Sequence, residues 1–381
     1  MVTEPLPPAL RSRLHLQGAE SPGVVPPTCT APLELLGTTY TMAQEVTWLD
    51  DKHFAVGRWD GSLGIFAFAE SATSGPVINC AVNSPAQEGV QMITSLDERS
   101  FVSSSDDGTI AVWSTASPTP WTDTRVCTLL QYDASFGAAN SGALVQVPSD
   151  IRYFVAGHAN GFVTIWRERD GHSNWDLVSS VDIRAPKPVN PWGLHNIRGI
   201  DVVSSGQGIQ SVVAGSEDGN LTLLEVPTGK IMSKTCYNPL ARRGINSLAM
   251  DGTTLLVANC AVGSADRNLW AYTVDVASAQ ITLTDAVNLV IESNAPQAFN
   301  FDVAWGVRTT SGGAFFSSTE EGVLWVGNAS ASGKLSVLGN VPVTRAVGQG
   351  HILNLGSAVC VSRNRLIVAS YDVSEFRVTA R

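Results

Sequence analysis

Hydrophobic and polar positions along the chain follow one pattern that returns several times. A short apolar run ends in small residues, an acidic or amide residue and a glycine follow, and a second apolar run closes on an aromatic or aliphatic residue. Two apolar runs joined by Asp-Gly or Asn-Gly predict a β-hairpin, because these residues accept the positive φ angles of a tight turn. The segments with this pattern are Phe54–Phe66, Phe101–Trp113, Tyr153–Trp166, Val212–Leu224 and Phe315–Val326.

Two weaker copies of the pattern complete the series. They are Leu255–Trp270 and Leu366–Phe376, in which Asp266 and Asp372 stand at the position of the turn acid. With these copies there are seven units, and the turns recur roughly every fifty residues. A period of this length predicts a repeat architecture rather than a chain of unrelated domains.

A further short apolar segment precedes each hairpin, and we expect it to form a strand. An upstream strand, a hairpin and a trailing strand together make the four-stranded blade of a β-propeller. The upstream segments are Val46–Leu49, Met92–Leu96, Leu144–Val147, Ile200–Val203, Ile245–Leu248, Phe301–Ala304 and Leu353–Leu355.

From residue 33 onward the chain resembles the WD40-repeat family of β-propellers. Ile245–Gly252 is similar to the family's inner strand and the turn after it, and Ser103–Trp113 is similar to its hairpin with the signature tryptophan. No unit holds both the Gly-His and the Trp-Asp pair of the family. The resemblance implies an all-β, seven-bladed, WD40-like propeller.

The family also has a structural hydrogen bond between a histidine and the turn acid. Gly350-His351 resembles the family's Gly-His dipeptide, and the interval from His351 to Asp372 is the one that lets the two residues meet. His195 and Asp218 show a similar interval. The resemblance therefore implies structural roles for both histidines.

The two ends of the repeat region are expected to meet in one blade. The last unit has only three strands before Arg381, whereas Leu33–Thr38 precedes the first inner strand and has no sheet of its own. We expect Leu33–Thr38 to supply the missing outer strand, which removes the open edges of the ring. Residues 1–32 are rich in proline and are predicted to be a flexible tail, and 33–381 a single propeller domain.

Composition narrows the classes of function. A net charge of −10 argues against a nucleic-acid ligand, because proteins that bind phosphate backbones carry basic patches. The six cysteines are scattered, without metal-ligand spacing, and indicate reduced thiols. There is no secretory signal and no apolar run of membrane-spanning length, so we expect a protein of the cytosol or nucleus. The sequence contains no nucleotide-binding loop, nucleophile elbow or HExxH motif, so no motif in it predicts an enzyme or a cofactor.

The residue before each turn acid is expected to face solvent at the mouth of the central channel. This residue is Trp59 in the first unit and Tyr371 in the last, and these two units are neighbours in a closed ring. An aromatic pair with carboxylates around it suits a partner that carries an apolar or cationic group. The alternative is that one of the rings packs under a long loop. The polar contacts expected around the pair are Arg58, His158, Glu217 and Glu320.

Two long connections between units supply a second candidate zone on the same face. Trp192 lies in the connection before the fourth inner strand, and Arg242 in the connection before the fifth. Exposed loops on a rigid scaffold are frequent sites of binding. Arg242 could pair with an acidic partner, although an exposed arginine can also be simply solvated.

An enzymatic alternative comes from the polar position within the inner strands. If these side chains point into the channel, their oxygen atoms converge on the axis, and oxygen ligands suit Ca²⁺ or Mg²⁺. Propellers of the lactonase and phosphotriesterase type look like this at their centre. A wet channel also explains polar residues there without any metal. The ligands of this alternative hydrolase are Asp201, Asn246, Asp302 and Asn354.

The function predicted from the sequence is therefore non-catalytic. We expect a scaffold or adaptor subunit that binds a peptide or protein partner on the loops around the channel mouth, without a cofactor. The metal-dependent hydrolase is the alternative. A third hypothesis is a structural subunit that makes its contacts through the outer strands.

Overall fold

The computed structural model describes residues 33–378 apart from several short segments. Within this part the chain forms twenty-six strands and one 3-10 turn, with no α-helix. None of the described residues belongs to a helix that is long and apolar enough to cross a membrane. The segments left out are 68–76, 83, 117–120, 148–149, 170–172, 204–209, 239–242, 260–266, 290–299, 310–311, 320–322, 343–355 and 361–364.

Five of the sheets are four-stranded antiparallel blades whose strands follow one another in chain order. They are blade two, β5 (Val90–Asp97), β6 (Ser100–Ser105), β7 (Ile110–Ser114) and β8 (Arg125–Leu129); blade three, β9 (Ala139–Gln146), β10 (Arg152–His158), β11 (Phe162–Glu168) and β12 (Trp175–Asp182); blade four, β13 (Ile197–Val203), β14 (Gln210–Ser216), β15 (Asn220–Val226) and β16 (Ile231–Cys236); blade five, β17 (Ile245–Asp251), β18 (Thr254–Asn259), β19 (Leu269–Asp275) and β20 (Gln280–Val287); and blade six, β21 (Asn300–Thr309), β22 (Gly312–Thr319), β23 (Val323–Ser330) and β24 (Leu335–Pro342).

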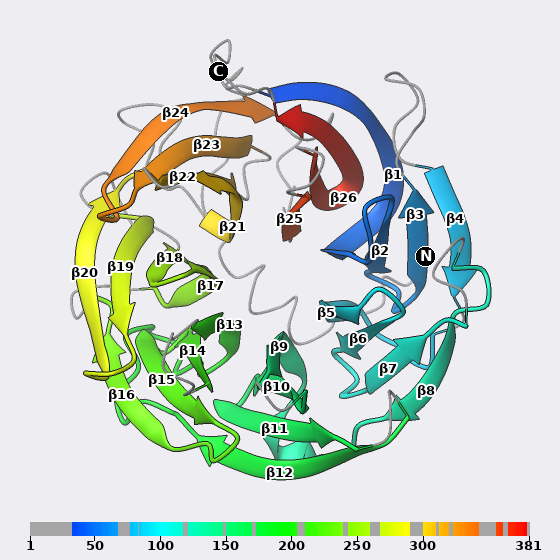
Figure 1. Ribbon diagram of the computed structural model, residues 1–381, viewed down its shortest axis with the longest axis horizontal. Helices are drawn as coiled ribbons and strands as arrows, with labels where there is room; N and C mark the ends of the chain where they lie inside the picture. The colour runs from blue at the N-terminus through cyan, green and yellow to red at the C-terminus, as the bar shows by residue number, and fades with distance from the viewer. Residues whose placement is uncertain are drawn as a thin grey trace.

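The sixth sheet holds blades one and seven together. Its strand order is β25 (Gly356–Cys360), β26 (Arg365–Val378), β1 (Leu33–Trp48), β2 (His53–Arg58), β3 (Leu63–Ala67) and β4 (Val77–Val82). The molecule is thus a ring of seven blades around a central axis (Figure 1). The first strand of each blade lies nearest the centre and the fourth lies at the rim, as the sequence pattern predicts.

The long strand β1 closes the ring. Its first half pairs with β26, with Leu33 opposite Val378 and Leu35 opposite Phe376. Its second half pairs with β2 as the inner strand of blade one. The predicted closure by Leu33–Thr38 is confirmed.

Strand β26 folds back on itself, which gives blade seven its two middle strands (Figure 1). The Arg365 guanidinium donates to the Glu375 carboxylate. Residues ten apart in a straight strand would lie about 33 Å from each other, so this contact requires a bend between them. The predicted inner strand of this blade, Leu353–Leu355, lies outside the described residues, and β25 follows it directly.

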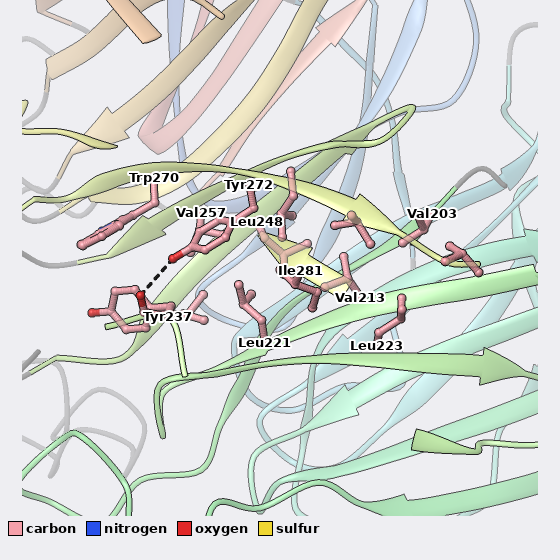
Figure 2. Packing of buried hydrophobic residues seen from close by; sticks show 14 residues of the cluster. Val203, Val213, Leu221, Leu223, Tyr237, Leu248, Val257, Trp270, Tyr272 and Ile281 are labelled. Atoms are coloured by element: carbon pink, nitrogen blue, oxygen red, sulfur yellow. Dashed lines mark hydrogen bonds between the residues drawn. The ribbon is translucent and has the colours of Figure 1, made fainter. Parts of the chain in front are cut away.

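The hydrophobic core is divided into clusters that lie between neighbouring blades. Figure 2 shows the cluster in which Val213 and Leu221 of blade four pack against Val257 of blade five. The Tyr272 hydroxyl of blade five donates to the Tyr237 carbonyl oxygen at 3.0 Å, which ties the same two blades together. Because each blade is covered on both faces, its middle strands are buried along most of their length, as β6, β7, β14 and β15 show.

The turns between the second and third strands of the blades have the predicted geometry. Gly108 has a φ of 86° and Gly219 a φ of 93°, which only glycine adopts without strain. At Gly219 a Cβ atom would also lie 2.6 Å from Val189. These glycines therefore fix both the hairpin and the approach of the connecting loop.

Variants of two adjacent residues of β1 test whether this strand closes the ring by packing into the last blade. Leu36 is 4% exposed and Leu35 is 53% exposed. Leu36→Ala should lower the free energy of unfolding by about 2–5 kcal/mol, because it leaves a cavity in the last blade. Leu35→Ala should change it by less than about 0.5 kcal/mol. Urea unfolding of the two variants measures the difference, and equal effects would contradict a closure packed through this strand.

Candidate partner-binding face

The loop face is the end of the ring formed by two kinds of segment. One is the turn between the second and third strands of each blade, and the other is the connection from each outer strand to the next inner strand. At blade two, Asp107 accepts the backbone N–H of Thr109 at 2.8 Å and that of Gln87 at 2.7 Å. The turn acid therefore holds its own hairpin and the connection beside it.

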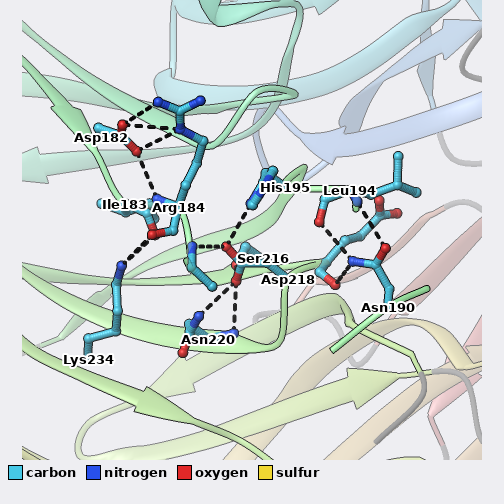
Figure 3. A network of polar contacts seen from close by, with 12 residues as sticks. Asp182, Ile183, Arg184, Asn190, Leu194, His195, Ser216, Asp218, Asn220 and Lys234 are labelled. Atoms are coloured by element: carbon cyan, nitrogen blue, oxygen red, sulfur yellow. Dashed lines mark hydrogen bonds and ion pairs between the residues drawn. The ribbon is translucent and has the colours of Figure 1, made fainter. Parts of the chain in front are cut away.

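Asp218 makes the most complete of these networks (Figure 3). Its carboxylate is 1% exposed and accepts the N–H groups of Ala185 at 2.6 Å and Asn220 at 3.1 Å. His195 Nδ1 lies 3.2 Å from the Asp218 carboxylate, which confirms the predicted structural pair. Since both carboxylate oxygens are engaged, Asp218 is a structural residue. The other predicted histidine, His351, lies outside the described residues.

The first predicted anchor lies where blades one and seven meet. Ala43 of β1 pairs with Arg58 of β2 on one side and with Tyr371 of β26 on the other. The backbones of Arg58 and Tyr371 therefore lie on either side of Ala43. Trp59 is half-buried, and its backbone N–H donates to the Met42 carbonyl oxygen at 3.2 Å. The side chain of Tyr371 is outside the described part of the structure.

Arg58 is less available than the sequence suggests. Its guanidinium donates to the Ser62 hydroxyl at 3.2 Å and lies 5.9 Å from the centre of the Phe66 ring. Burial lowers the pKa of Arg58 below its ordinary value. The side chain therefore packs along its own hairpin and leaves only part of its surface for a partner.

The expectation that His158 contacts a partner is wrong. Its exposed fraction is 0%, because the end of β10 turns the imidazole inward under the rings of Tyr132 and Phe136. Nδ1 donates to the Gly137 carbonyl at 2.9 Å, and Nε2 accepts the Thr164 hydroxyl at 2.6 Å. Burial lowers the pKa of His158 to about 4, so the ring is neutral at physiological pH.

Trp192 and Glu217 border the same cavity on the loop face. Glu217 accepts Arg198 Nε at 2.9 Å and Asn196 Nδ2 at 2.6 Å. Trp192 is 48% exposed, and the Arg243 guanidinium lies 4.3 Å from the centre of its ring. Two other predicted contacts, Glu320 and Arg242, lie outside the described residues.

Asn190 organises the loop that carries Trp192, a role that the sequence analysis does not identify. Its Nδ2 donates to the carbonyl oxygens of Leu194 at 2.8 Å and Glu217 at 2.6 Å. Its Oδ1 accepts the N–H groups of Trp192 at 3.1 Å and Leu194 at 2.9 Å. Asparagine before proline is a turn signal, and Asn190-Pro191 is the feature that could have indicated this loop.

A cavity of about 230 Å³ lies at the channel mouth beside this loop. The inner strands of blades one to six border it, together with the Trp192 loop and the turn of blade four. Glu45 and Gln91 border the cavity from blades one and two. Across from them, the residues that border it from blade four and the connections beside it are Trp192, Arg198 and Arg243.

The two carboxylates of the alternative metal site are engaged in hydrogen bonds within and between inner strands. Asp201 accepts the N–H groups of Val202 at 2.7 Å and of Met250, in the next blade, at 2.8 Å. Burial raises the pKa of Asp201 to about 6. Asp302 accepts the Ser247 hydroxyl, again from a neighbouring blade. These carboxylates tie inner strands together, which corrects the expectation that they all point into the channel.

The remaining residues of that set do not restore a metal centre. Asn246 and Asp302 border the cavity, and Asn354 lies outside the described residues. Across the part of the chain that the structure describes, no three His, Cys, Asp or Glu side chains are grouped to hold a metal ion.

Comparison with known proteins identifies the fold. No protein-family model matches the sequence, and no curated protein matches it. Among solved structures, the β-propeller domain of Cps50 (Swd1) from Myceliophteria thermophila is similar, with a TM-score of 0.62 and 15% identity. The match covers 91% of this chain and all of that domain. The fold is that of a seven-bladed β-propeller. Because 1373 chains of solved structures match, this propeller fold alone does not identify a function.

The buried histidine predicts a pH dependence of stability. Between pH 6.5 and about 4 the unfolded chain binds a proton at His158 that the folded propeller does not. Stability should therefore fall as the pH is lowered, by about 2–3 kcal/mol from this group between pH 7 and pH 4.5. In His158→Gln this part of the decrease should disappear. Protonation of Asp201 stabilises the folded protein as the pH falls through the same range, because its pKa is raised in the folded state. This contribution is the same in the wild type and in His158→Gln, so it cancels in the comparison.

Denaturant unfolding at several pH values measures this difference. A titration of the His158 ring by NMR reads the pKa directly. Identical pH profiles for the two proteins, or a ring that titrates near pH 6.5, would contradict the buried neutral state.

Proposed function

We propose that this propeller is a non-catalytic interaction module that binds a peptide or protein segment on its loop face. The observation that carries the proposal is Trp192, a large aromatic side chain that is 48% exposed at the edge of the channel-mouth cavity. Tryptophan and arginine are the residues most enriched among those that dominate binding energy, and here Arg243 stacks on the tryptophan ring.

The loop that presents Trp192 is already ordered without a partner. Asn190 makes four hydrogen bonds across it and is 5% exposed. A loop fixed in advance loses little conformational entropy on binding, so more of the contact energy appears as affinity. A rigid scaffold with preorganised loops therefore favours recognition of a partner.

The rim between blades one and seven is the second contact zone of the proposal. Trp59 keeps part of its surface accessible there, and Tyr371 follows on the neighbouring strand. A segment that reaches from Trp192 across the cavity to this rim would contact both zones. As an adaptor of this kind the protein would work in the cytosol or nucleus as part of a larger assembly.

Replacement of the exposed tryptophan tests the proposal. Trp192→Ala should weaken partner binding by about 2 kcal/mol, roughly thirtyfold, and leave the melting temperature nearly unchanged. Leu283→Ala is the matched control, because Leu283 is 49% exposed but lies on the outer strand β20. Partners are captured from cells on the wild-type protein, identified, and titrated against each variant. Equal affinities for Trp192→Ala and wild type would refute the assignment, and a loss in Leu283→Ala alone would place binding on the outer strands.

A further inference from the structure

The loop face carries opposite charges on its two sides, and we infer that it selects a charge-segregated segment. In this arrangement the basic part of the bound segment lies over blades one and two, and its acidic part lies over blades four and five. The inference rests on the proposed function and deepens it by naming the chemistry of the partner.

Carboxylates dominate the loop face over blades one and two. Among the described residues there, Arg58 is the single guanidinium, and it is half-buried along its own hairpin. Asp60, Glu88 and Asp107 are exposed, whereas Glu45 and Asp106 are half-buried. A cationic side chain is therefore favoured on this side.

Cations dominate the loop face from the end of blade three to blade five. The carboxylates of this side are occupied: Asp182 pairs with Arg184 at 2.6 Å, Glu217 pairs with Arg198 at 2.9 Å, and Asp218 is buried. The cations on this side, counted over the residues that the structure describes, are Arg184, Lys187, Arg198, Lys234, Arg243 and Arg267.

Three of these cations are exposed, and among the described carboxylates only Asp182 acts on one of them, Lys234. Lys187 and Arg267 are exposed, and Lys234 is exposed while its ammonium donates to the carbonyl oxygens of Ile183 and Arg184 (Figure 3). Hydrogen bonds to neutral carbonyls hold the ammonium in place but do not cancel its charge. The side is therefore positive although the whole chain has a net charge of −10.

One cavity joins the two sides, so one segment can contact both. Glu45 and Gln91 border it from blades one and two, and Trp192 and Arg243 border it from the opposite side. A uniformly charged ligand such as a nucleic acid would be attracted at one side and repelled at the other. A segment with separated charges is attracted at both sides of the loop face. The opposite electrostatic potentials of the two sides also determine the direction in which the segment lies.

Two labelled peptides of the same composition test the inference. One has a block of glutamates and a block of lysines on either side of a central tryptophan, and the other alternates the same charges. Fluorescence anisotropy with the full chain should show about tenfold tighter binding of the block peptide at low salt. The advantage should shrink at an ionic strength near 0.15 M or above, because exposed charges are then screened beyond about 8 Å.

A pair of lysine variants locates the effect on the loop face. Lys187→Glu reverses a charge on the basic side, whereas Lys230→Glu makes the same change in net charge in the turn between β15 and β16, at the opposite end of the blade. Lys187→Glu should lower the affinity for the block peptide at least threefold, and Lys230→Glu should leave it unchanged.

Several outcomes would overturn the inference. They are equal affinity for the two peptides, no binding of either, equal effects of the two lysine variants, or tighter binding of a single-stranded oligonucleotide than of the block peptide. Partner capture that still depends on Trp192 would show in each case that the proposed function stands while the charge selection fails.

Discussion

The antiparallel pairing of β1 with β26 is the constraint on which the rest of the molecule depends. Every blade is packed between two neighbours, so the clusters between blades form completely only if the ring is closed. Blades one and seven are joined by backbone hydrogen bonds within one sheet rather than by side-chain packing alone. The positions of the turns around the channel mouth, and therefore of Trp192 and Trp59, follow from this closure.

The parts of the fold that depend on local chemistry were predictable from the sequence. The hairpins follow from Asp-Gly and Asn-Gly between apolar runs, and Gly108 and Gly219 have the positive φ angles that this pattern requires. The closing strand follows from counting, because the last unit lacks one strand and Leu33–Thr38 had no other sheet to join. The contact of His195 with Asp218 follows from the interval that the family resemblance indicates.

The parts that depend on packing between blades were not predictable. The sequence suggested that His158 contacts a partner at the channel mouth, but Phe136 and Tyr132 from the preceding connection cover it. Asp201 carries the residue type of a metal ligand, yet its partner is the N–H of Met250 in the next blade. The direction of such a side chain depends on a residue about fifty positions away, which no local pattern encodes.

The division of β1 between two blades has a consequence for how the chain folds. The half that belongs to blade seven is synthesised more than three hundred residues before its partner β26, since Leu35 pairs with Phe376. Loop closure over such a separation is slow, and its entropy cost is offset only when β26 forms its contacts with β1. Until then residues 33–41 present an unsatisfied backbone edge on the growing chain. The ring can therefore be completed only when β26 is available to pair with this strand, and a chain interrupted before β26 would keep an unpaired β-edge, which favours association with other copies.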